Sequence, residues 1–205
     1  MTHPLIWNFE CLLKPKLTLN LLETPKKDPL KWEARFFWPD SELICMNIQD
    51  ESLENLTLYE RKHKEDTYYL IPEKNYNVKQ RGSRLLYKPI TNETPFATGF
   101  GNKITLENLE GTHIETHPKP ELLKNIFDSA KQLALIIPVR KESYTYKFPI
   151  TPTIKLELVR VEVHNKIYYS ACVEGRSHDL VKTMSDDLFG KRKHCDFVSF
   201  LISIS

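Results

Sequence analysis

Glycine is scarce in this chain, which has only 6 glycines against 13 prolines among its 205 residues. This scarcity argues against a glycine-rich loop as the main device for binding a nucleotide. Long apolar runs are also missing, and no stretch approaches the roughly 18 residues that a membrane-spanning helix needs. Residues 1–7 have neither the basic region nor the apolar stretch of a signal peptide. We therefore expect a soluble protein with no membrane partner.

Paired cysteines are absent as well, because the four cysteines are widely spaced and form no C-x-x-C motif. They are Cys11, Cys45, Cys172 and Cys195. This spacing favours free thiols in a reducing compartment, so we expect a cytoplasmic protein. The 7 histidines have no cysteine or carboxylate partners at zinc-ligand spacing. The chain also lacks G-x-S-x-G, P-loop and kinase signatures.

The charge is unevenly distributed along the chain. The net charge is only +2, which gives no reason to expect a nucleic-acid partner. Residues 61–88, however, carry eight basic side chains against three acidic ones. Such a local excess suggests an anionic ligand, although a solvated basic surface would have the same composition.

The hydrophobic pattern predicts an α+β protein rich in antiparallel strands. A 40% hydrophobic and 11% aromatic composition is enough for a core, and no linker interrupts it, so we expect one domain over residues 1–205. Alternation predicts strands at residues 31–38, 66–70, 76–81, 84–88, 139–148, 154–163 and 167–174. Apolar stripes predict helices at residues 120–135 and 178–189. Residues 2–22 and 51–58 are further helix candidates, and residues 105–115 are ambiguous.

Residues 75–88 predict a basic hairpin. Gly82-Ser83 suits a two-residue type II′ turn, because glycine supplies the positive φ at the first corner. This turn pairs Arg81 with Arg84, Lys79 with Leu86 and Asn77 with Lys88. Lys79, Arg81, Arg84 and Lys88 then share one face. Opposed like charges destabilise a strand pair unless an anion lies between them, so this face could hold phosphates. It could equally be the solvated face of an ordinary hairpin.

Acidic residues follow in the later strands. Lys155, Glu157, Arg160 and Glu162 alternate with apolar residues, but the phase slips between Leu158 and Val159, and a β-bulge there would return all four to one face. Tyr168, Ser170, Cys172 and Glu174 share a face of the next strand. These acids could form salt bridges with the bases, or their oxygens could hold Mg²⁺ or Mn²⁺ beside phosphates.

The order of these segments resembles the CYTH superfamily of triphosphate tunnel proteins. The resemblance rests on Asp66-Thr67-Tyr68, on the alternating bases from Asn77 to Arg81, on the strand ending in Lys88, on Val139-Arg140-Lys141, and on the glutamates of residues 154–162 and 170–174. It covers roughly residues 30–201. It implies a closed antiparallel β-barrel whose interior is a charged tunnel and whose apolar faces meet outer helices.

The resemblance also implies site residues. Those that would bind the phosphates are Arg35, Lys79, Arg81, Arg84, Lys88, Arg140 and Lys141. Those that would bind Mg²⁺ or Mn²⁺ are Glu33, Glu157, Glu162 and Glu174. Lys79, Arg81 and Glu174 would act in catalysis.

One motif departs from the family pattern. The family's first strand carries Glu-x-Glu-x-Lys, whereas this chain has Lys31-Trp32-Glu33-Ala34-Arg35, so Lys31 replaces a carboxylate. This loss should weaken cation binding.

The function expected from the resemblance is metal-dependent hydrolysis of a small molecule bearing a triphosphate, whether inorganic, thiamine or nucleoside triphosphate. The alternative is a non-catalytic module that binds polyphosphate, a nucleotide or a phosphorylated protein. Cyclase chemistry on ATP and an adaptor with an internally salt-bridged barrel are further possibilities.

Overall fold

The computed structural model describes residues 2–14, 26–106 and 119–205. Its strands, in chain order, are β1 (Thr2–Ile6), β2 (Phe9–Leu13), β3 (Lys31–Pro39), β4 (Ile44–Ile48), β5 (Glu60–Leu70), β6 (Asn77–Arg81), β7 (Arg84–Lys88), β8 (Ile90–Glu93), β9 (Thr98–Phe100), β10 (Ile104–Thr105), β11 (Leu135–Lys147), β12 (Ile154–Val163) and β13 (Lys166–Gly175). The α-helices are α1 (Pro120–Gln132), α2 (His178–Phe189) and α3 (Phe197–Ile204), and the two short 3₁₀ helices are η1 (Glu51–Glu54) and η2 (Leu56–Leu58).

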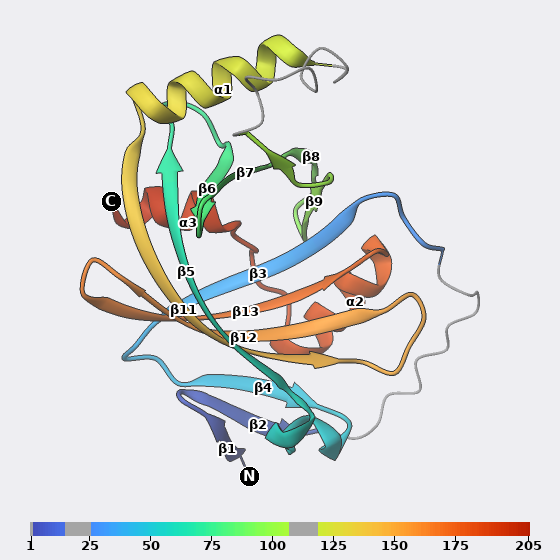
Figure 1. The fold of residues 1–205 in the computed structure, drawn as a ribbon. Coiled ribbons are helices and arrows are strands. Elements are labelled where there is room, and N and C mark those ends of the chain that lie inside the picture. Colours follow the sequence, from blue (N-terminus) through green and yellow to red (C-terminus); the bar gives the residue numbers. More distant parts are fainter. Residues whose placement is uncertain (1, 15–25, 107–118) are drawn as a thin grey trace.

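Most of the described strands form one antiparallel sheet, which is strongly curled (Figure 1). The order in this ten-stranded sheet is β10-β7-β6-β5-β11-β12-β13-β3-β9-β8. The chain itself joins the two ends of this order, because β7 runs into β8 with only Pro89 between them. The sheet must therefore curl far enough to bring its last strand beside the next-to-first. The predicted α+β architecture, with an antiparallel barrel-like sheet, charged interior and packing helices, is confirmed.

Strict alternation along the strands separates a charged inner face from an apolar outer face. In β3, Trp32, Ala34, Phe36 and Trp38 are buried in the outer core, while Glu33 and Arg35 line the interior. Alternate side chains of a strand point to opposite faces, so one nine-residue strand supplies both layers.

Two layers cover the outer face of the sheet. Helix α2 and the smaller sheet β1-β2-β4 pack on the side of β3 and β13 (Figure 1). Helix α1 covers the outer face of the β6-β7 hairpin, where Leu123, Ile126 and Ala130 meet Val78 and Leu85. The spacing of three and four residues puts these helical side chains on one apolar stripe.

Helix α3 packs against the inner face instead of the outer one. Its residues Phe197, Phe200 and Leu201 form a core cluster with Val159 and Val161 of β12. Asp196 caps the helix by accepting hydrogen bonds from the backbone N–H groups of Val198 and Ser199. The interior is therefore apolar where α3 lies and charged beyond it.

The hairpin prediction is confirmed and the bulge prediction is wrong. Arg81 pairs with Arg84, Lys79 with Leu86 and Asn77 with Lys88, and Gly82 has a φ of 58°. Strand β12 keeps continuous register with both β11 and β13 through Leu158 and Val159. The two adjacent apolar residues, Leu158 and Val159, lie on opposite faces of the regular strand. Both are buried, because Leu158 faces the outer core and Val159 lies on the inner face where α3 packs.

The weaker sequence signals gave mixed results. The helix candidate at residues 2–22 is wrong over residues 2–13, which form the antiparallel pair β1-β2, and residues 15–22 lie outside the described part. Residues 51–58 form η1 and η2 instead of an α-helix. In the ambiguous segment 105–115, Thr105 ends β10 and residues 107–115 lie outside the described part. Among residues 2–14, 26–106 and 119–205 we find no helix with the length and apolar character to span a bilayer.

Candidate anion-binding cavity

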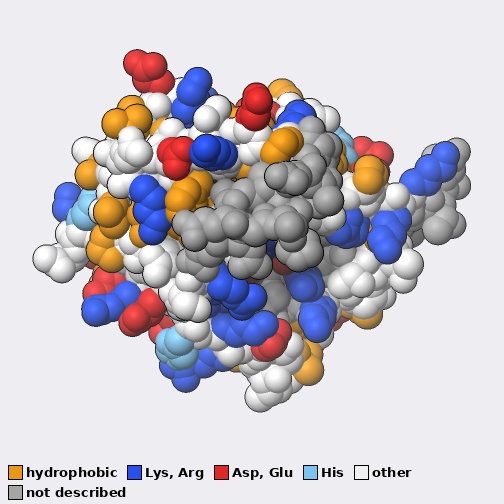
Figure 2. Space-filling model, turned by 45° about the horizontal axis from the view of Figure 1, so that its top comes forward, with side chains coloured by type: hydrophobic (Ala, Val, Ile, Leu, Met, Phe, Trp, Pro, Cys, Tyr) orange, Lys and Arg blue, Asp and Glu red, His pale blue; other side chains and the backbone are white. Residues whose placement is uncertain are grey.

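The charged interior encloses a cavity of about 170 Å³ whose walls are mainly basic. Its described lining includes eight cationic side chains and three carboxylates. The cations are Lys31, Arg35, Lys64, Lys79, Arg81, Lys88, Lys103 and Lys141, and the carboxylates are Glu33, Glu157 and Glu174. Figure 2, which brings the top of the molecule forward, shows Lys and Arg side chains gathered around the centre of this face. We refer to this space as the basic cavity.

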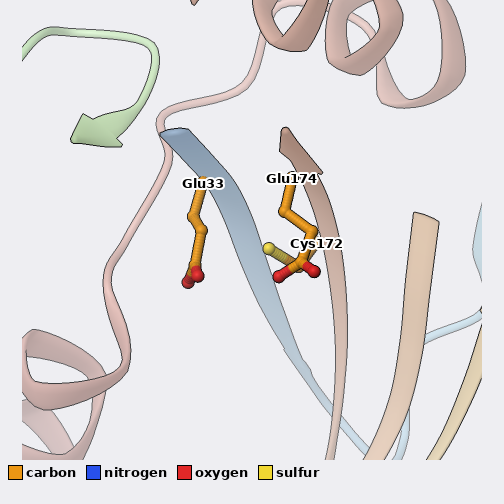
Figure 3. Close-up of side chains that lie close together, drawn as sticks. All are labelled: Glu33, Cys172 and Glu174. Atoms are coloured by element: carbon orange, nitrogen blue, oxygen red, sulfur yellow. The ribbon is translucent and has the colours of Figure 1, made fainter. Parts of the chain in front are cut away.

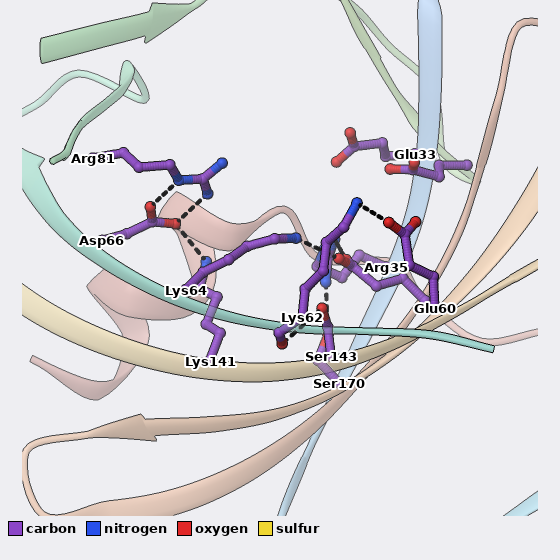
Figure 4. Close-up of polar contacts among 12 residues, drawn as sticks. Glu33, Arg35, Glu60, Lys62, Lys64, Asp66, Arg81, Lys141, Ser143 and Ser170 are labelled. Carbon is purple, nitrogen blue, oxygen red and sulfur yellow. Dashed lines mark hydrogen bonds and ion pairs between the residues drawn. The ribbon is translucent and has the colours of Figure 1, made fainter. Parts of the chain in front are cut away.

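A buried aspartate organises one wall of the basic cavity. The side chain of Asp66 on β5 is 0% exposed and accepts two hydrogen bonds from Arg81, at 2.6 and 2.8 Å. It accepts a third from Lys79 at 2.9 Å. Lys141 Nζ lies 3.5 Å from the same carboxylate, as Figure 4 shows beside the Arg81 contacts. Because Lys79, Arg81 and Lys141 hold its charged form, the pKa of Asp66 lies well below its usual range despite burial.

A second carboxylate lies on β12, two strands away from the strand of Asp66 in the sheet order. Glu157 on β12 accepts hydrogen bonds from Arg35 at 2.9 Å and from Lys64 at 3.1 Å. Burial opposes its charged form, but these two cations outweigh burial and lower the pKa of Glu157 to about 2. Arg35 also donates to the hydroxyl of Ser170 at 3.2 Å.

Strands β3 and β13 contribute two glutamates that the strand register places opposite each other. Glu33 on β3 pairs with Glu174 on β13. Lys31 Nζ lies 2.6 Å from Glu174 and 3.5 Å from Glu33, and Lys88 Nζ lies 2.5 Å from Glu33. Burial opposes the ionised form of Glu33, but Lys88 and Lys31 outweigh it and keep the pKa of Glu33 well below its usual range.

The cations of the cavity outnumber its carboxylates, and three of its lysines have lowered pKa values. Burial, which is only partly offset by Asp66, lowers the pKa of Lys79 to about 8. Burial and the nearby charge of Lys79 keep the pKa of Lys141 well below its usual range. Burial, with Lys88 and Arg81 nearby, also lowers the pKa of Lys103. Lowered pKa values mean that the charged forms of these lysines are disfavoured in the empty cavity. A bound anion would stabilise these charged forms and thereby the folded protein.

A divalent metal fits this donor set poorly. Glu33, Cys172 and Glu174 bring one ligand atom each within 4.8 Å of one another (Figure 3). Both carboxylates, however, are already paired with ammonium groups, and burial raises the pKa of the Cys172 thiol well above its usual value. A protonated thiol is a poor ligand, and Mg²⁺ prefers oxygen ligands. We therefore derive no chemical step through a metal at this position, and the Mg²⁺ or Mn²⁺ expectation stays a prediction.

The structure brings most of the predicted site residues together. Those that line the basic cavity are Glu33, Arg35, Lys79, Arg81, Lys88, Lys141, Glu157 and Glu174. Arg84 shares the hairpin face but lies at its exposed tip. Arg140 and Glu162 lie outside, because they are register partners on the outer faces of β11 and β12. Arg140 is 71% exposed, whereas Lys141, its neighbour on the other face, is 10% exposed.

Sequence reasoning missed three cavity lysines and the role of Asp66. Lys31 was read only as a lost carboxylate, and Lys64 and Lys103 were assigned no role. Lys64, Asp66 and Tyr68 alternate along one face of β5, so extending the predicted strand 66–70 back to residue 60 would have added Lys64 to the face that carries Asp66. Lys103 precedes the two-residue strand β10 and had no comparable signal.

Comparisons with known proteins add little to this geometry. No protein-family model matches the chain, and no curated protein sequence matches it. Among solved structures, the chain is similar to a crystal structure of a proposed adenylate cyclase from Bacillus halodurans, with 10% identity and a TM-score of 0.39, covering 76% of this chain and 86% of that one. A likeness at this level carries no argument about function. The CYTH resemblance therefore remains an inference from sequence.

Proposed function

We propose that the basic cavity binds the phosphate chain of a triphosphate or a short polyphosphate. The excess of cations over carboxylates in the lining of the cavity supports this proposal most strongly. Seven of these cations lie on the inner faces of strands β3, β5, β6, β7 and β11, and they converge on one small volume. A polyanion can meet them all, because each phosphate offers several acceptor oxygens.

The basic side chains match phosphate in two different ways. Arg35 and Arg81 offer planar forks that can donate two parallel hydrogen bonds, while the lysines act as point charges with freely rotating donors. The forks are already oriented, since Arg81 binds Asp66 and Arg35 binds Glu157. A bound chain would therefore find donors whose rotamers are fixed in advance, which reduces the entropy cost of binding.

The size of the basic cavity favours a phosphate chain over an organic group. Pockets for drug-sized ligands occupy roughly 300–1,000 Å³, whereas this cavity holds about 170 Å³. A hollow of about 470 Å³ adjoins it, shares Lys31 and Glu174 with it, and adds Lys27, Lys155 and Arg176. Further phosphates or an organic substituent would lie in this outer hollow.

Hydrolysis of the bound chain, as the sequence prediction has it, would be an additional step. Cations around the chain would stabilise the charge that develops on phosphate oxygens during in-line attack. Binding without turnover is the simpler reading of a site whose carboxylates are all paired. The assay below measures both.

The test is isothermal titration with tripolyphosphate in buffer containing EDTA, with phosphate release followed in parallel with and without Mg²⁺ or Mn²⁺. The double change Lys79→Gln and Arg81→Gln should weaken binding by at least about 100-fold, because each charged hydrogen bond contributes roughly 1.5–3 kcal/mol. Arg84→Gln is the matched control on the same hairpin face and should change affinity less than about threefold.

A second pair of variants, on strand β11, shows whether a loss of binding comes from the cavity or from misfolding. Lys141→Gln should weaken binding, whereas Arg140→Gln, one residue away on the outer face, should not. Absence of tripolyphosphate binding by the folded wild-type protein, or equal effects of the Lys141 and Arg140 changes, would refute the proposal. Phosphate release that depends on Lys79 would extend it to a hydrolase.

A further inference from the structure

Two of the three glutamates that line the basic cavity lie in an arrangement that requires a cation. Glu33 and Glu174 are direct register partners on neighbouring antiparallel strands, with side chains on the same inner face. Like charges placed directly opposite each other destabilise a strand pair. A group that binds both carboxylates must compensate for this repulsion.

Lys31 supplies that group from the same strand. It lies two residues before Glu33 on β3 and therefore points to the same face. Its Nζ donates to Oε2 of Glu174 at 2.6 Å and lies 3.5 Å from Oε1 of Glu33. Lys88 completes the balance from β7, with its Nζ 2.5 Å from the same oxygen of Glu33. Two carboxylates thus meet two ammonium groups.

We propose that Lys31 serves as a built-in cation, bridging Glu33 and Glu174 where a divalent ion would otherwise bind, and that the basic cavity therefore binds its anion without metal. An ammonium group has three donors, and Lys31 uses one of them in its hydrogen bond to Glu174, while Glu33 is its ion-pair partner at 3.5 Å. A further donor is available to a phosphate oxygen, since the Lys31 side chain is 39% exposed and lines both the cavity and the outer hollow. The second half of this inference rests on the proposed function, and the first half does not.

The exclusion of metal follows from charge. Lys31 already contacts Glu174, and Lys88 already contacts Glu33. A divalent ion bound between the two carboxylates would therefore lie beside both ammonium groups. Repulsion at such range in a partly buried site opposes binding strongly. Removing the charge of Lys31 leaves one ammonium for two carboxylates and should convert the pair into a cation site.

The experiment measures Mn²⁺ binding directly, in the absence of any phosphate. The wild-type protein should give no saturable titration. Lys31→Gln should bind Mn²⁺ saturably, at least about tenfold more tightly than the weakest affinity that the titration can measure. Lys31→Arg keeps the charge and should behave as wild type. Lys155→Gln is the matched control for loss of a nearby lysine, because Lys155 lines the outer hollow and is the register partner of Glu174.

The outcomes separate the two proposals. Saturable Mn²⁺ binding by the wild-type protein, or no gain in a folded Lys31→Gln variant, would overturn the built-in cation. Tripolyphosphate binding that appears only when Mn²⁺ is added would also overturn it, while leaving the proposed function intact. A third outcome is that the wild-type protein binds no Mn²⁺, that Lys31→Gln binds it, and that tripolyphosphate binds under no condition. This outcome would support the role of Lys31 as a built-in cation and refute the proposed function.

Discussion

Asp66 offers the sharpest test of how the basic cavity is held together. Its fully buried carboxylate binds Arg81 through two oxygens, binds Lys79 at 2.9 Å and lies 3.5 Å from Lys141. Asp66→Asn keeps the shape of the side chain but removes its charge. Three cations would then face one another with their common anion gone, and Lys79 and Lys141 are only 12% and 10% exposed.

The expected loss is large for one isosteric change. Removing one partner of a buried ion pair costs about 3–5 kcal/mol in the free energy of unfolding, because an uncompensated charge stays buried. For a domain of this size each kcal/mol shifts the melting temperature by about 2–4 °C, so we expect a decrease of roughly 6–20 °C. Glu65 is the residue before Asp66, lies on the outer face and is 83% exposed. Glu65→Gln should therefore change the free energy of unfolding by less than about 0.5 kcal/mol.

The assay is urea unfolding of both variants, with and without tripolyphosphate. The anion should recover more stability in Asp66→Asn than in the wild-type protein, because it replaces the missing negative charge beside Lys79 and Arg81. A loss below about 1 kcal/mol would refute the view that Asp66 carries the charge balance of this wall. Equal stabilisation of both proteins by tripolyphosphate would place the anion elsewhere.

Two further predictions concern pH and the inner helix. The pKa of Lys79 is lowered from 10.5 to about 8, so as the pH rises the folded protein releases this proton before the unfolded chain does. The contribution of Lys79 to the free energy of unfolding should therefore increase from about pH 8 to pH 10.5. Over the same range the affinity for tripolyphosphate should fall, because Lys79 loses its positive charge. In Lys79→Arg the charge persists, and this part of the pH dependence should vanish from titrations made across that range; an unchanged profile would contradict the assignment. Phe197 stacks on Tyr68 with centroids 5.0 Å apart, and Lys141 Nζ lies 3.3 Å from its ring centroid. Phe197→Ala should thus cost about 3–5 kcal/mol in urea unfolding, whereas Ile202→Ala, at an exposed position of the same helix, should cost less than about 0.5 kcal/mol.

Local patterns in the sequence were sufficient for much of the sheet. The Gly82-Ser83 turn fixed the register of the β6-β7 hairpin, because a two-residue turn leaves one pairing for the flanking strands. The alternation in residues 31–38 separated the outer aromatic residues from Glu33 and Arg35, since the period of a strand is two. The same rule placed Cys172 and Glu174 on one face of β13, and they line or adjoin the same cavity wall.

The candidate site was harder to assign where the face of a strand depended on its neighbours. The sequence placed Glu162 beside Glu157 by assuming a bulge, but α3 packs against the inner valines of β12 and leaves the strand regular. Arg140 and Lys141 are adjacent, and the sequence favoured Arg140 as the phosphate ligand, whereas in the structure Arg140 is 71% exposed and Lys141 lines the cavity. Their positions follow from the register of β11 with β5 and β12, which turns Lys141 inward.

The sequence by itself determined the antiparallel strands, the basic hairpin, helices α1 and α2, and the local excess of positive charge, because turns, periodicity and charge are properties of neighbouring residues. Only the tertiary structure decided which charges meet. Lys31 and Glu33 of β3 meet Lys88 of β7 and Glu174 of β13. Asp66 of β5 meets Lys79 and Arg81 of β6 and Lys141 of β11. These contacts span up to 143 residues of chain, as between Lys31 and Glu174. They arise because the curled sheet brings distant inner faces around one small volume, where burial makes every unpaired charge costly.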